Sequence, residues 1–597
     1  MEGTYVISAK KVAEQATMQS FLNCYLRETG NYSEIQKPED LSTTLSQKFI
    51  SCLLINQGIE MLLPVSYWSL TERHIYQFPL YYRSLNGTFH TLDYVTLTTL
   101  IVKELLIDQN RKYAEDELVL RVMLSCQSMT TYIGKRFEDR GKLTDEDFDY
   151  IEAEQSLLFG HLMHPTAKSK QGLTQEEDEL FSPELKGEFQ LHYFSVHPSI
   201  INEDSSLHLQ ASELIKEELI DGAVDQEWIH QFKERVLIPV HPLQVNSLLK
   251  KAEVLKHIQK GTLDYLGPVG RMYTATSSFR TVYSSLTRFM FKFSVPVKIT
   301  NSLRQNQQKE LDRGVEVSRL LQTQLGEKLA NNYPDFKIIQ DPAYLNINIP
   351  NLESEFAVMI RENPFYEKSE NTSLVAALCQ DHAYGGRSRI YSIITAIARR
   401  EGRAIEEVSV EWFDRYLDIS LDPMLWLHQH YGIALEAHQQ NAVVKLKEGY
   451  PSTFYYRDNQ GYYFSESKSE ELAQLLPNLN EKSDTICSDD VANERFRYYF
   501  FFNNLFGLIN AFGVNGLIEE KHLVTILRER LSQYLAIQPS PLIKSLLEEP
   551  VLPCKANLLT RFYDMDELIG SMATQSVYTM VRNPIAQEVT VRHGNGF

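Results

Sequence analysis

The sequence lacks the cysteine and glycine patterns that mark several common kinds of site. Its six cysteines are scattered through 597 residues, without a C-x-x-C pair or a metal-ligand spacing, which argues against a disulfide framework and a zinc site. It contains neither a P-loop nor a G-x-G-x-x-G motif. Any nucleotide site in this chain must therefore be built in another way.

The sequence is also poor in positive charge and in long hydrophobic runs. Its 59 basic residues are outnumbered by 78 acidic ones, which gives a net charge of −19 and a pI near 5.4. Nucleic acid and anionic membranes need a basic surface, so neither is expected as a partner. The stretch "RYYFFFNNLFGLINAFGVNGLI" is interrupted by four asparagines and predicts a core helix rather than a membrane span. With no signal-peptide pattern at the start, we expect a cytoplasmic protein.

The periodicity of the sequence predicts an α+β fold with more than one domain, because 597 residues exceed what one hydrophobic core supports. Helical spacing of apolar residues covers 9–28, 94–108, 115–138 and 144–159, and helices return after about 370. Strand-like alternation covers 48–95 and dominates 189–300. These shifts in pattern predict domains at 1–145, 146–400 and 401–597.

One window of this acidic chain contains no acid at all. The 45 residues between Asp264 and Glu310 contain no Asp or Glu, although the average composition predicts about six. The same window holds seven basic residues: Arg271, Arg280, Arg288, Lys292, Lys298, Arg304 and Lys309. Such a local excess of cations is typical of a site for phosphates or carboxylates.

Alternation within the window predicts two strands with one polar face each. In "FMFKFSVPVKI" the side chains of Lys292 and Lys298 fall opposite the apolar positions, and in "TATSSFRTVY" Ser278 and Arg280 share a face opposite Phe279. Neighbouring strands of this kind would line one pocket with hydroxyl groups and cations. The alternative is a solvated sheet face whose charge is balanced by acids elsewhere.

Two further segments concentrate polar chemistry. "GHLMHPTAKSKQG" places His164 and Lys168 after a helix, where they could contact an anion or form only a basic surface loop. "EAHQQN" begins at Glu436, and Asp458 follows about twenty residues later. These two carboxylates are candidates for Mg²⁺, which takes one or two protein carboxylates together with substrate phosphates.

The motifs taken together resemble those of the NRPS-independent siderophore synthetases of the aerobactin synthetase family. The matching segments follow the family's order: "HPTAKSKQG", "VHPLQ", "TSSFRTV", "KFSVPVKITNSLR", "GIALEAHQQNAVV", "YYRDNQG" and "KANLLTRF". The resemblance implies a cupped-hand fold of thumb, fingers and palm. It also implies ATP-dependent adenylation of a carboxylic acid, followed by condensation with an amine or alcohol and release of AMP.

The same resemblance assigns roles to individual residues. The implied ATP contacts are Ser278, Arg280, Thr281, Lys292, His438, Gln440, Asn441 and Asp458. The implied carboxylate contacts are His164, Lys168, Arg304 and His438, and the implied metal ligands are Glu436 and Asp458. Arg280, Lys292 and His438 are the implied catalytic groups. Lys555 and Arg561 belong to a recurring motif, and Lys170 stands where many relatives have arginine.

The segments are most similar to the citrate-activating branch that includes the petrobactin enzyme joining citrate to spermidine. This predicts citrate and a polyamine as substrates, with ATP and Mg²⁺, in a homodimer. One alternative is a relative that acts on a preformed citryl amide or another dicarboxylate. A second is a siderophore-binding or ferric reductase protein, but an iron–sulfur cluster needs clustered cysteines and the last hundred residues contain only Cys554.

Overall fold

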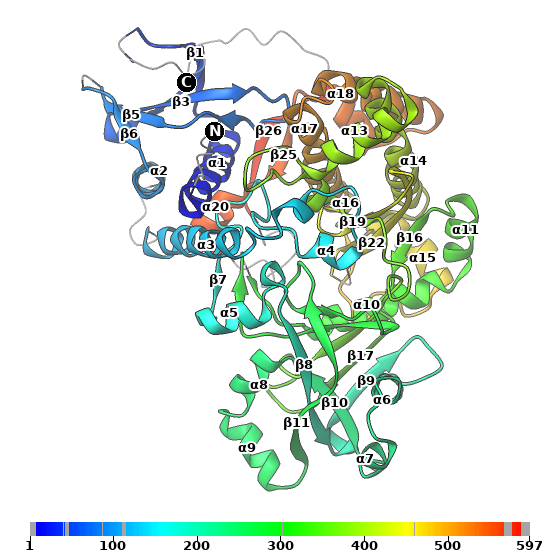
Figure 1. Ribbon diagram of the computed structural model, residues 1–597. Helices are drawn as coiled ribbons and strands as arrows, with labels where there is room; N and C mark the ends of the chain where they lie inside the picture. The colour runs from blue at the N-terminus through cyan, green and yellow to red at the C-terminus, as the bar shows by residue number, and fades with distance from the viewer. Residues whose placement is uncertain are drawn as a thin grey trace.

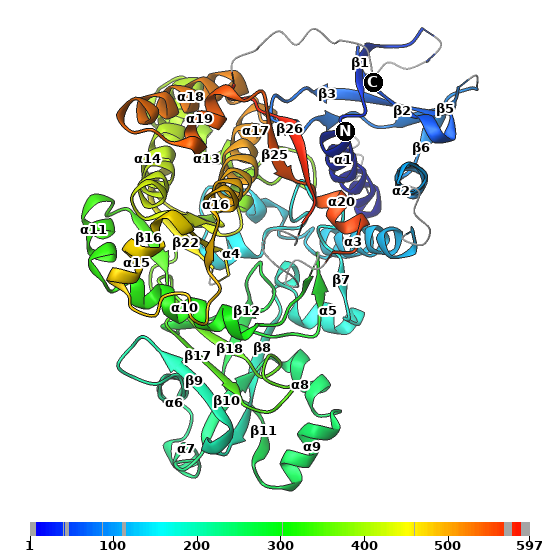
Figure 2. The same ribbon diagram turned by 180° about the vertical axis from the view of Figure 1, so that it is seen from behind.

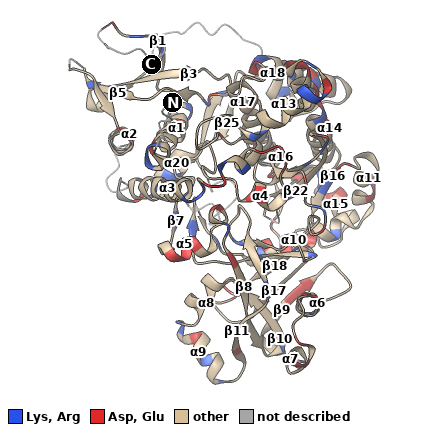
Figure 3. Ribbon diagram, in the orientation of Figure 1, with Lys and Arg blue, Asp and Glu red and all other residues tan. Residues whose placement is uncertain are grey.

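The computed structural model describes residues 8–39, 41, 47–85, 87–109, 115–300, 302–458, 460–565 and 576–586. They form three lobes that meet at the centre of the molecule (Figure 1). Figure 3 shows acidic residues gathered on outer elements such as α5 (Gln175–Phe181) and β9 (Ile201–Ser205). The mixed architecture confirms the α+β class, whereas the three domain boundaries stay predictions.

The first lobe is a six-stranded antiparallel sheet covered by three helices. Its buried core joins residues of α1, α2 and α3 to the inner face of β2 and β3. The predicted helices at 9–28, 94–108 and 115–138 are confirmed. The elements are α1 (Ala9–Thr29), β1 (Ser33–Gln36), β2 (Lys48–Leu54), β3 (Ile59–Tyr67), β4 (Ile75–Tyr76), β5 (Leu80–Ser84), β6 (His90–Leu92), α2 (Tyr94–Asp108) and α3 (Glu115–Lys135).

The C-terminal part of the chain returns to this first lobe. Strands β25 (Val551–Lys555) and β26 (Tyr578–Arg582) lie between the first sheet and the helices of the third lobe in both views (Figures 1 and 2). The buried Glu28 carboxylate accepts hydrogen bonds from the N–H groups of Leu558 and Leu559, at the start of α20 (Asn557–Phe562). On the side of the first lobe, the central region is therefore enclosed both by the N-terminal helix α1 and by the C-terminal segment from β25 to α20.

The second lobe is an eight-stranded antiparallel sheet. The strand order is β10-β8-β11-β12-β13-β18-β17-β9. Helices α6, α8 and α9 pack on one face, and α10 packs on the other over β17 and β18. The elements are β8 (Glu188–Val196), α6 (Ala211–Asp221), α7 (Gln226–His230), β10 (Val236–Val240), α8 (Pro242–Leu248), α9 (Ala252–Gln259), β11 (Leu263–Ala275), β12 (Thr281–Tyr283), β13 (Phe289–Phe293), α10 (Gln308–Leu321), β17 (Ala343–Ile347) and β18 (Val358–Glu362). The helix after α10, α11 (Gln324–Asn332), packs into the core of the third lobe.

Short elements connect the first two lobes. The helix predicted over 144–159 is wrong in length, because only α4 (Tyr150–Glu154) forms there and the chain then turns towards the centre. A small sheet joins β7 (Lys170–Gln171) to β14 (Lys298–Ile299) and β15 (Ser302–Leu303). This sheet carries the segment after β13 back towards the first lobe.

The third lobe packs two small sheets against long helices. Its elements are β16 (Phe336–Ile339), β19 (Thr372–Leu374), α12 (Val375–Cys379), α13 (Arg389–Glu401), α14 (Ile405–Tyr431), β20 (Ile433–Leu435), β21 (Ala442–Lys447), β22 (Tyr450–Arg457), β23 (Tyr462–Ser465), α15 (Ser469–Leu475), β24 (Ile486–Cys487), α16 (Asp489–Phe496), α17 (Phe506–Val514), α18 (Glu520–Ile537) and α19 (Pro541–Glu548). The hydrophobic stretch from Arg497 is buried here as a wide π-helical segment, Arg497–Leu505, followed by α17. Within the described ranges, no helix combines the length and apolar character of a membrane span.

Candidate active site

A cavity of about 300 Å³ lies where the three lobes meet. Its lining contains basic residues from all of them: Arg27, Arg73, Lys168, Arg280, Lys292, Arg304, Arg361, Arg457 and Lys555. Against these nine, the described lining offers only the carboxylates Glu436 and Asp458. An enclosed site with this excess of positive charge attracts a polyanion.

All the residues that the sequence assigned to ATP, carboxylate or metal lie in this lining. They are His164, Lys168, Ser278, Arg280, Thr281, Lys292, Arg304, Glu436, His438, Gln440, Asn441 and Asp458. Lys555 also lines the cavity, whereas Arg561 is buried outside it and pairs with Asp564. The structure thus brings the assigned residues together, while their individual roles stay predictions.

Ser278 and Arg280 do not lie on a strand, so that part of the sequence prediction is wrong. Strand β11 ends at Ala275 and β12 begins at Thr281, which leaves both residues in the connecting turn. Phe279 adopts a positive φ of 69° and buries its ring in the core of the second lobe. The anchored ring fixes a tight turn, and the residues on either side of it line the cavity.

The predicted polar face of β13 is confirmed for Lys292. Phe291 and Phe293 point into the apolar core, while Lys292 pairs across the sheet with Thr281 of β12. Its Nζ lies 2.8 Å from Oδ1 of Asp458, which enters from the end of β22. Lys298, expected on the same face, lies in the separate small sheet and is not part of the cavity lining.

Arg280 is a buried cation with no carboxylate at ion-pair distance among the described residues. It is 2 % exposed, and its Nη1 donates to Oδ1 of Asn306 at 3.0 Å. Burial lowers the pKa of Arg280 to about 10. The guanidinium stays charged at neutral pH. Burying this charge costs free energy, and a bound anion would offset that cost.

The "EAHQQN" segment forms the wall opposite the turn. Nδ1 of His438 accepts hydrogen bonds from the N–H groups of Gln440 and Asn441 at 3.2 and 3.3 Å, so the ring proton is on Nε2, which faces Glu436 Oε1 at 3.6 Å. Burial lowers the pKa of His438 to about 4, which keeps the ring neutral. Gln440 then reaches across to the hydroxyl of Ser277 at 3.3 Å.

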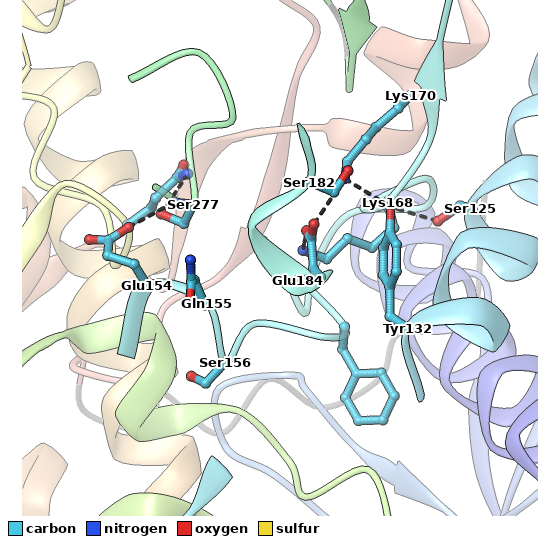
Figure 4. Close-up of polar contacts among 12 residues, drawn as sticks. Ser125, Tyr132, Glu154, Gln155, Ser156, Lys168, Lys170, Ser182, Glu184 and Ser277 are labelled. Atoms are coloured by element: carbon cyan, nitrogen blue, oxygen red, sulfur yellow. Dashed lines mark hydrogen bonds and ion pairs between the residues drawn. The ribbon is translucent and has the colours of Figure 1, made fainter. Parts of the chain in front are cut away.

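Glu154 of α4 joins these two walls, although the sequence gave no reason to select it. Its carboxylate forms an ion pair with Arg457 at 2.6 Å and accepts a hydrogen bond from the N–H of Ser277 at 2.8 Å. Arg457 in turn donates to the carbonyl oxygen of Gln440 at 2.8 Å. Figure 4 shows Glu154 reaching Ser277 from below the turn. One buried carboxylate therefore fixes both the turn and the opposite wall.

The carboxylate-binding candidates occupy the side of the cavity nearest the first lobe. His164 is buried, and its Nδ1 accepts from the N–H of Thr166. The guanidinium of Arg304 is oriented by Thr300, whose hydroxyl accepts from Nη2 at 2.9 Å. Lys168 lines the cavity, but its Nζ is held 2.5 Å from Glu184.

Lys170 is a structural residue and is not part of the cavity lining. Its buried Nζ donates to the hydroxyls of Tyr132 and Ser182 and lies 2.9 Å from Glu184 (Figure 4). Lys170, where the sequence departs from the expected arginine, therefore belongs to a buried network next to Lys168 and lies outside the cavity lining.

This network predicts a pH-dependent contribution to stability. Burial opposes ionisation of Glu184, but Lys168 and Lys170 outweigh it and lower the pKa of Glu184 to about 2. A carboxylate with a lowered pKa stabilises the fold above its unfolded value, and that stabilisation is lost as pH falls through the folded value. Glu184→Gln should therefore lower the melting temperature by roughly 5 °C at pH 7, because breaking a buried pair costs about 3–5 kcal/mol.

The measurement is thermal unfolding of both proteins from pH 7 to pH 3. The difference in melting temperature should be constant above about pH 5 and shrink below that, where the carboxyl of the unfolded chain takes up its proton. The exposed Glu176→Gln on α5 is the matched control and should show no difference. A difference that grows as the pH falls would contradict the assignment.

The two carboxylates of the cavity fit Mg²⁺ only with help from a substrate. Among the residues that the structure describes, no three His, Cys, Asp or Glu side chains gather as a metal site. Asp458 already pairs with Lys292, and Glu436 accepts from the hydroxyl of Tyr463. One or two carboxylates plus phosphate oxygens is the usual donor set for this ion.

Several residues of the lining escaped the sequence analysis. Arg361 on β18 binds Asp341 through two hydrogen bonds of 2.7 and 2.8 Å and lies 3.8 Å from Asp458. Arg27 and Arg73 enter from the first lobe, and Asn503 enters from the π-helical segment. For Arg361 the sequence offered one signal, a charged residue inside the apolar run "FAVMIRE". The other three residues have no local signal, because only the fold brings them to the cavity.

Comparison with known proteins supports the resemblance. The IucA / IucC family model matches residues 149–380, and a model of ferric iron reductase FhuF-like transporters matches 410–570. The chain is 47% identical to a spermidine-citrate ligase of Bacillus anthracis, over 98% of this chain and 99% of that protein. It is 33% identical to the rhizobactin siderophore biosynthesis protein RhbC of Rhizobium meliloti, over 96% and 97% of the two chains.

Solved structures give the same result for the fold. ATP-bound aerobactin synthetase IucA of Klebsiella pneumoniae superposes with a TM-score of 0.87 at 27% identity, covering 96% of this chain and 100% of that one. The petrobactin biosynthesis protein AsbB of Bacillus anthracis superposes with a TM-score of 0.72 at 18% identity, over 97% and 95% of the two chains. The likeness in fold thus extends over all three lobes.

Proposed function

The chain belongs to the IucA / IucC family, and from that premise we propose that it is an ATP-dependent ligase of siderophore biosynthesis that joins citrate to a polyamine such as spermidine. The observation that carries this proposal is the central cavity, where the described lining has nine basic side chains and two carboxylates, and where no described carboxylate lies at ion-pair distance from the buried Arg280. Such a site binds a nucleotide polyphosphate and a polycarboxylate side by side. The relatives' names mention ATP, which is a polyphosphate, citrate, which is a polycarboxylate, and the amine spermidine.

In the proposed first step, a citrate carboxylate oxygen attacks the α-phosphorus of ATP. The bond from that phosphorus to the bridging oxygen breaks, and pyrophosphate leaves. Negative charge builds on the phosphoryl oxygens in the transition state, and Arg280 and Lys292, fixed before the substrate arrives, stabilise it. Ser278 and Thr281 orient the phosphates, and Gln440 and Asn441 hold the nucleotide against the opposite wall.

In the second step, the neutral amine attacks the acyl carbon, and the carbon–oxygen bond to AMP breaks while the nitrogen loses a proton. His164 and Arg304 hold the remaining citrate carboxylates, and the neutral His438 donates from Nε2 towards the reacting groups. Glu436 and Asp458 would hold Mg²⁺, which supplies charge neutralisation on the phosphates when it is bound. The cytoplasmic location and the homodimer stay predictions.

Trapping with hydroxylamine tests the proposed function. The enzyme is incubated with ATP, Mg²⁺ and hydroxylamine together with citrate, a citryl amide, or another dicarboxylate. We expect citryl hydroxamate, pyrophosphate and AMP, with citrate the preferred acid. Hydrolysis of ATP to ADP without a hydroxamate would refute adenylation, and preference for a citryl amide would favour the alternative relative.

The ferric reductase alternative makes a separate prediction. An iron–sulfur cluster absorbs visible light and needs several cysteine ligands close together. Cys554 is alone in the last hundred residues, and its thiol is buried. The protein should therefore show no visible iron–sulfur absorbance, and such absorbance would favour the reductase.

Replacing Arg304 separates the two anion sites. Arg304→Lys keeps the positive charge but loses the planar fork that can bind a carboxylate through two hydrogen bonds. We expect KM for citrate to rise roughly 10- to 100-fold, the value of one charge-assisted hydrogen bond, while KM for ATP changes little. Initial rates of pyrophosphate release measure both constants, with the exposed Arg288→Lys as control. An equal rise in both would contradict the assignment.

A further inference from the structure

A second cavity, of about 40 Å³, adjoins the candidate active site. Arg73, His161, Leu162 and Ala167 line both cavities, so the two share a wall. The rest of the small cavity is lined by residues of α1, α3 and the adjoining loops, and by Asp381, which do not line the large one. It therefore lies beside the large cavity towards α1 and α3, and none of the residues assigned to ATP, carboxylate or metal lines it.

The lining of the small cavity suits a short alkyl chain. Met129, Phe159 and Leu162 supply apolar side chains, and Ser20 and Ser125 supply hydroxyl groups. The volume is that of about three water molecules, or of the last few heavy atoms of an extended chain. A flexible chain of methylene groups fits such a narrow, largely apolar space better than a compact polar group does.

A single carboxylate lies in the described part of this lining. Asp381 pairs with Arg73 through Oδ2, and Oδ1 receives no hydrogen bond from the described residues. The Asp381 side chain is 34% exposed whereas Arg73 is 6% exposed, which places the carboxylate towards solvent. Arg73 is also held by Asn510 at 2.8 Å, and its charge is neutralised by Asp381 itself. The small cavity therefore carries no excess positive charge.

The shared wall contains one charged group, Arg73, which is paired with Asp381, and the ring of His161. His161 is partly exposed and lies 2.6 Å from Nδ2 of Asn503, and desolvation by its neighbours together with nearby basic groups lowers the pKa of His161 well below its usual value. A cation in the small cavity would thus face an uncharged ring in the wall that separates it from the large cavity. In the large cavity it would meet nine basic residues and only two carboxylates. Four of the nine pair with carboxylates behind the lining, but repulsion from the remaining cations disfavours a second ammonium group in the large cavity.

We propose that the small cavity binds the remote, protonated end of a polyamine substrate. Asp381 receives the ammonium group through Oδ1, the methylene groups lie between α1 and α3, and the neutral primary amine projects past His161 into the large cavity. This inference rests on the proposed function and deepens it, because it assigns the part of the amine that does not react. A monoamine has no such part and would use the large cavity alone.

Two variants test the proposal in the full chain. Asp381→Asn removes the charge, and Ala16→Leu fills the small cavity from α1 without touching the ion pair of Arg73. Both should raise KM for spermidine roughly tenfold, the value of one charge-assisted contact, and leave KM for butylamine unchanged. Ala16→Leu should also leave citryl hydroxamate formation and pyrophosphate release unchanged. Asp221→Asn, an exposed acid on α6 of the second lobe, is the control.

The outcomes distinguish this inference from the proposed function. If the wild-type protein forms no citryl hydroxamate, adenylation of citrate itself is refuted. If it forms hydroxamate but both variants keep the wild-type KM for spermidine, the small cavity is not the polyamine site. An equal rise in KM for spermidine and butylamine with Asp381→Asn would likewise overturn the inference, since a structural disturbance would affect both amines.

Discussion

An Arg280→Ala variant is expected to lose citrate-dependent pyrophosphate release by about 10³-fold or more, while its melting temperature stays close to that of the wild-type protein. The loss of activity follows from the position of the guanidinium, which is buried in the cavity with no carboxylate at ion-pair distance in the described part of the chain. The stability follows from the same fact, because the variant removes a desolvated charge and leaves no unpaired acid behind. Only the hydrogen bond to Asn306 is lost, worth about 1 kcal/mol.

This pairing of effects separates a substrate contact from a structural cation. Arg288→Ala removes an exposed arginine from the same acid-free window and should change neither quantity. Arg280→Lys keeps the charge on a different geometry and should recover part of the activity. Normal pyrophosphate release by a folded Arg280→Ala variant would refute the assignment, and so would a loss of several degrees in melting temperature.

Local periodicity was enough to predict the helices of the first lobe and the polar face of β13. Apolar residues at helical spacing mark α1, α2 and α3, and alternation around Lys292 separates its face from Phe291 and Phe293. The same alternation failed at Ser278 and Arg280, because a tight turn with a positive φ at Phe279 also places neighbouring side chains on opposite sides. A single sequence does not distinguish the two arrangements.

The residues of the site that escaped prediction are those whose partners are distant in the chain. Arg361 reads as a charge at the end of a strand until β18 is paired with β13, which places it beside Asp458. Glu154 reads as an exposed acid on a helix, yet the end of β22 brings Arg457 to it. Their importance comes from burial and long-range pairing, and neither property has a local pattern.

Replacing Glu154 is expected to have the second large effect, on both stability and ATP binding, although Glu154 does not line the cavity. Glu154→Gln keeps the shape of the side chain and an oxygen for the N–H of Ser277, but leaves the buried guanidinium of Arg457 without its counter-ion. Breaking one partner of a buried pair costs about 3–5 kcal/mol, so the melting temperature should fall by roughly 5 °C. KM for ATP should rise as well, because Arg457 also holds the carbonyl of Gln440.

A double variant distinguishes the ion pair from a general disturbance. In the double variant Glu154→Gln, Arg457→Gln both buried charges are gone. Its loss of melting temperature should therefore be smaller than the sum of the losses in the two single variants. Thermal unfolding of the four proteins closes this cycle, and the exposed Glu217→Gln on α6 controls for the loss of one acid. Strict additivity would show that the two side chains act independently, and an unchanged KM for ATP in Glu154→Gln would show that the turn and the opposite wall hold their positions without it. Positive coupling together with a raised KM would identify Glu154 as a positioning residue, one that stabilises the nucleotide site through the backbone of Ser277 and the guanidinium of Arg457.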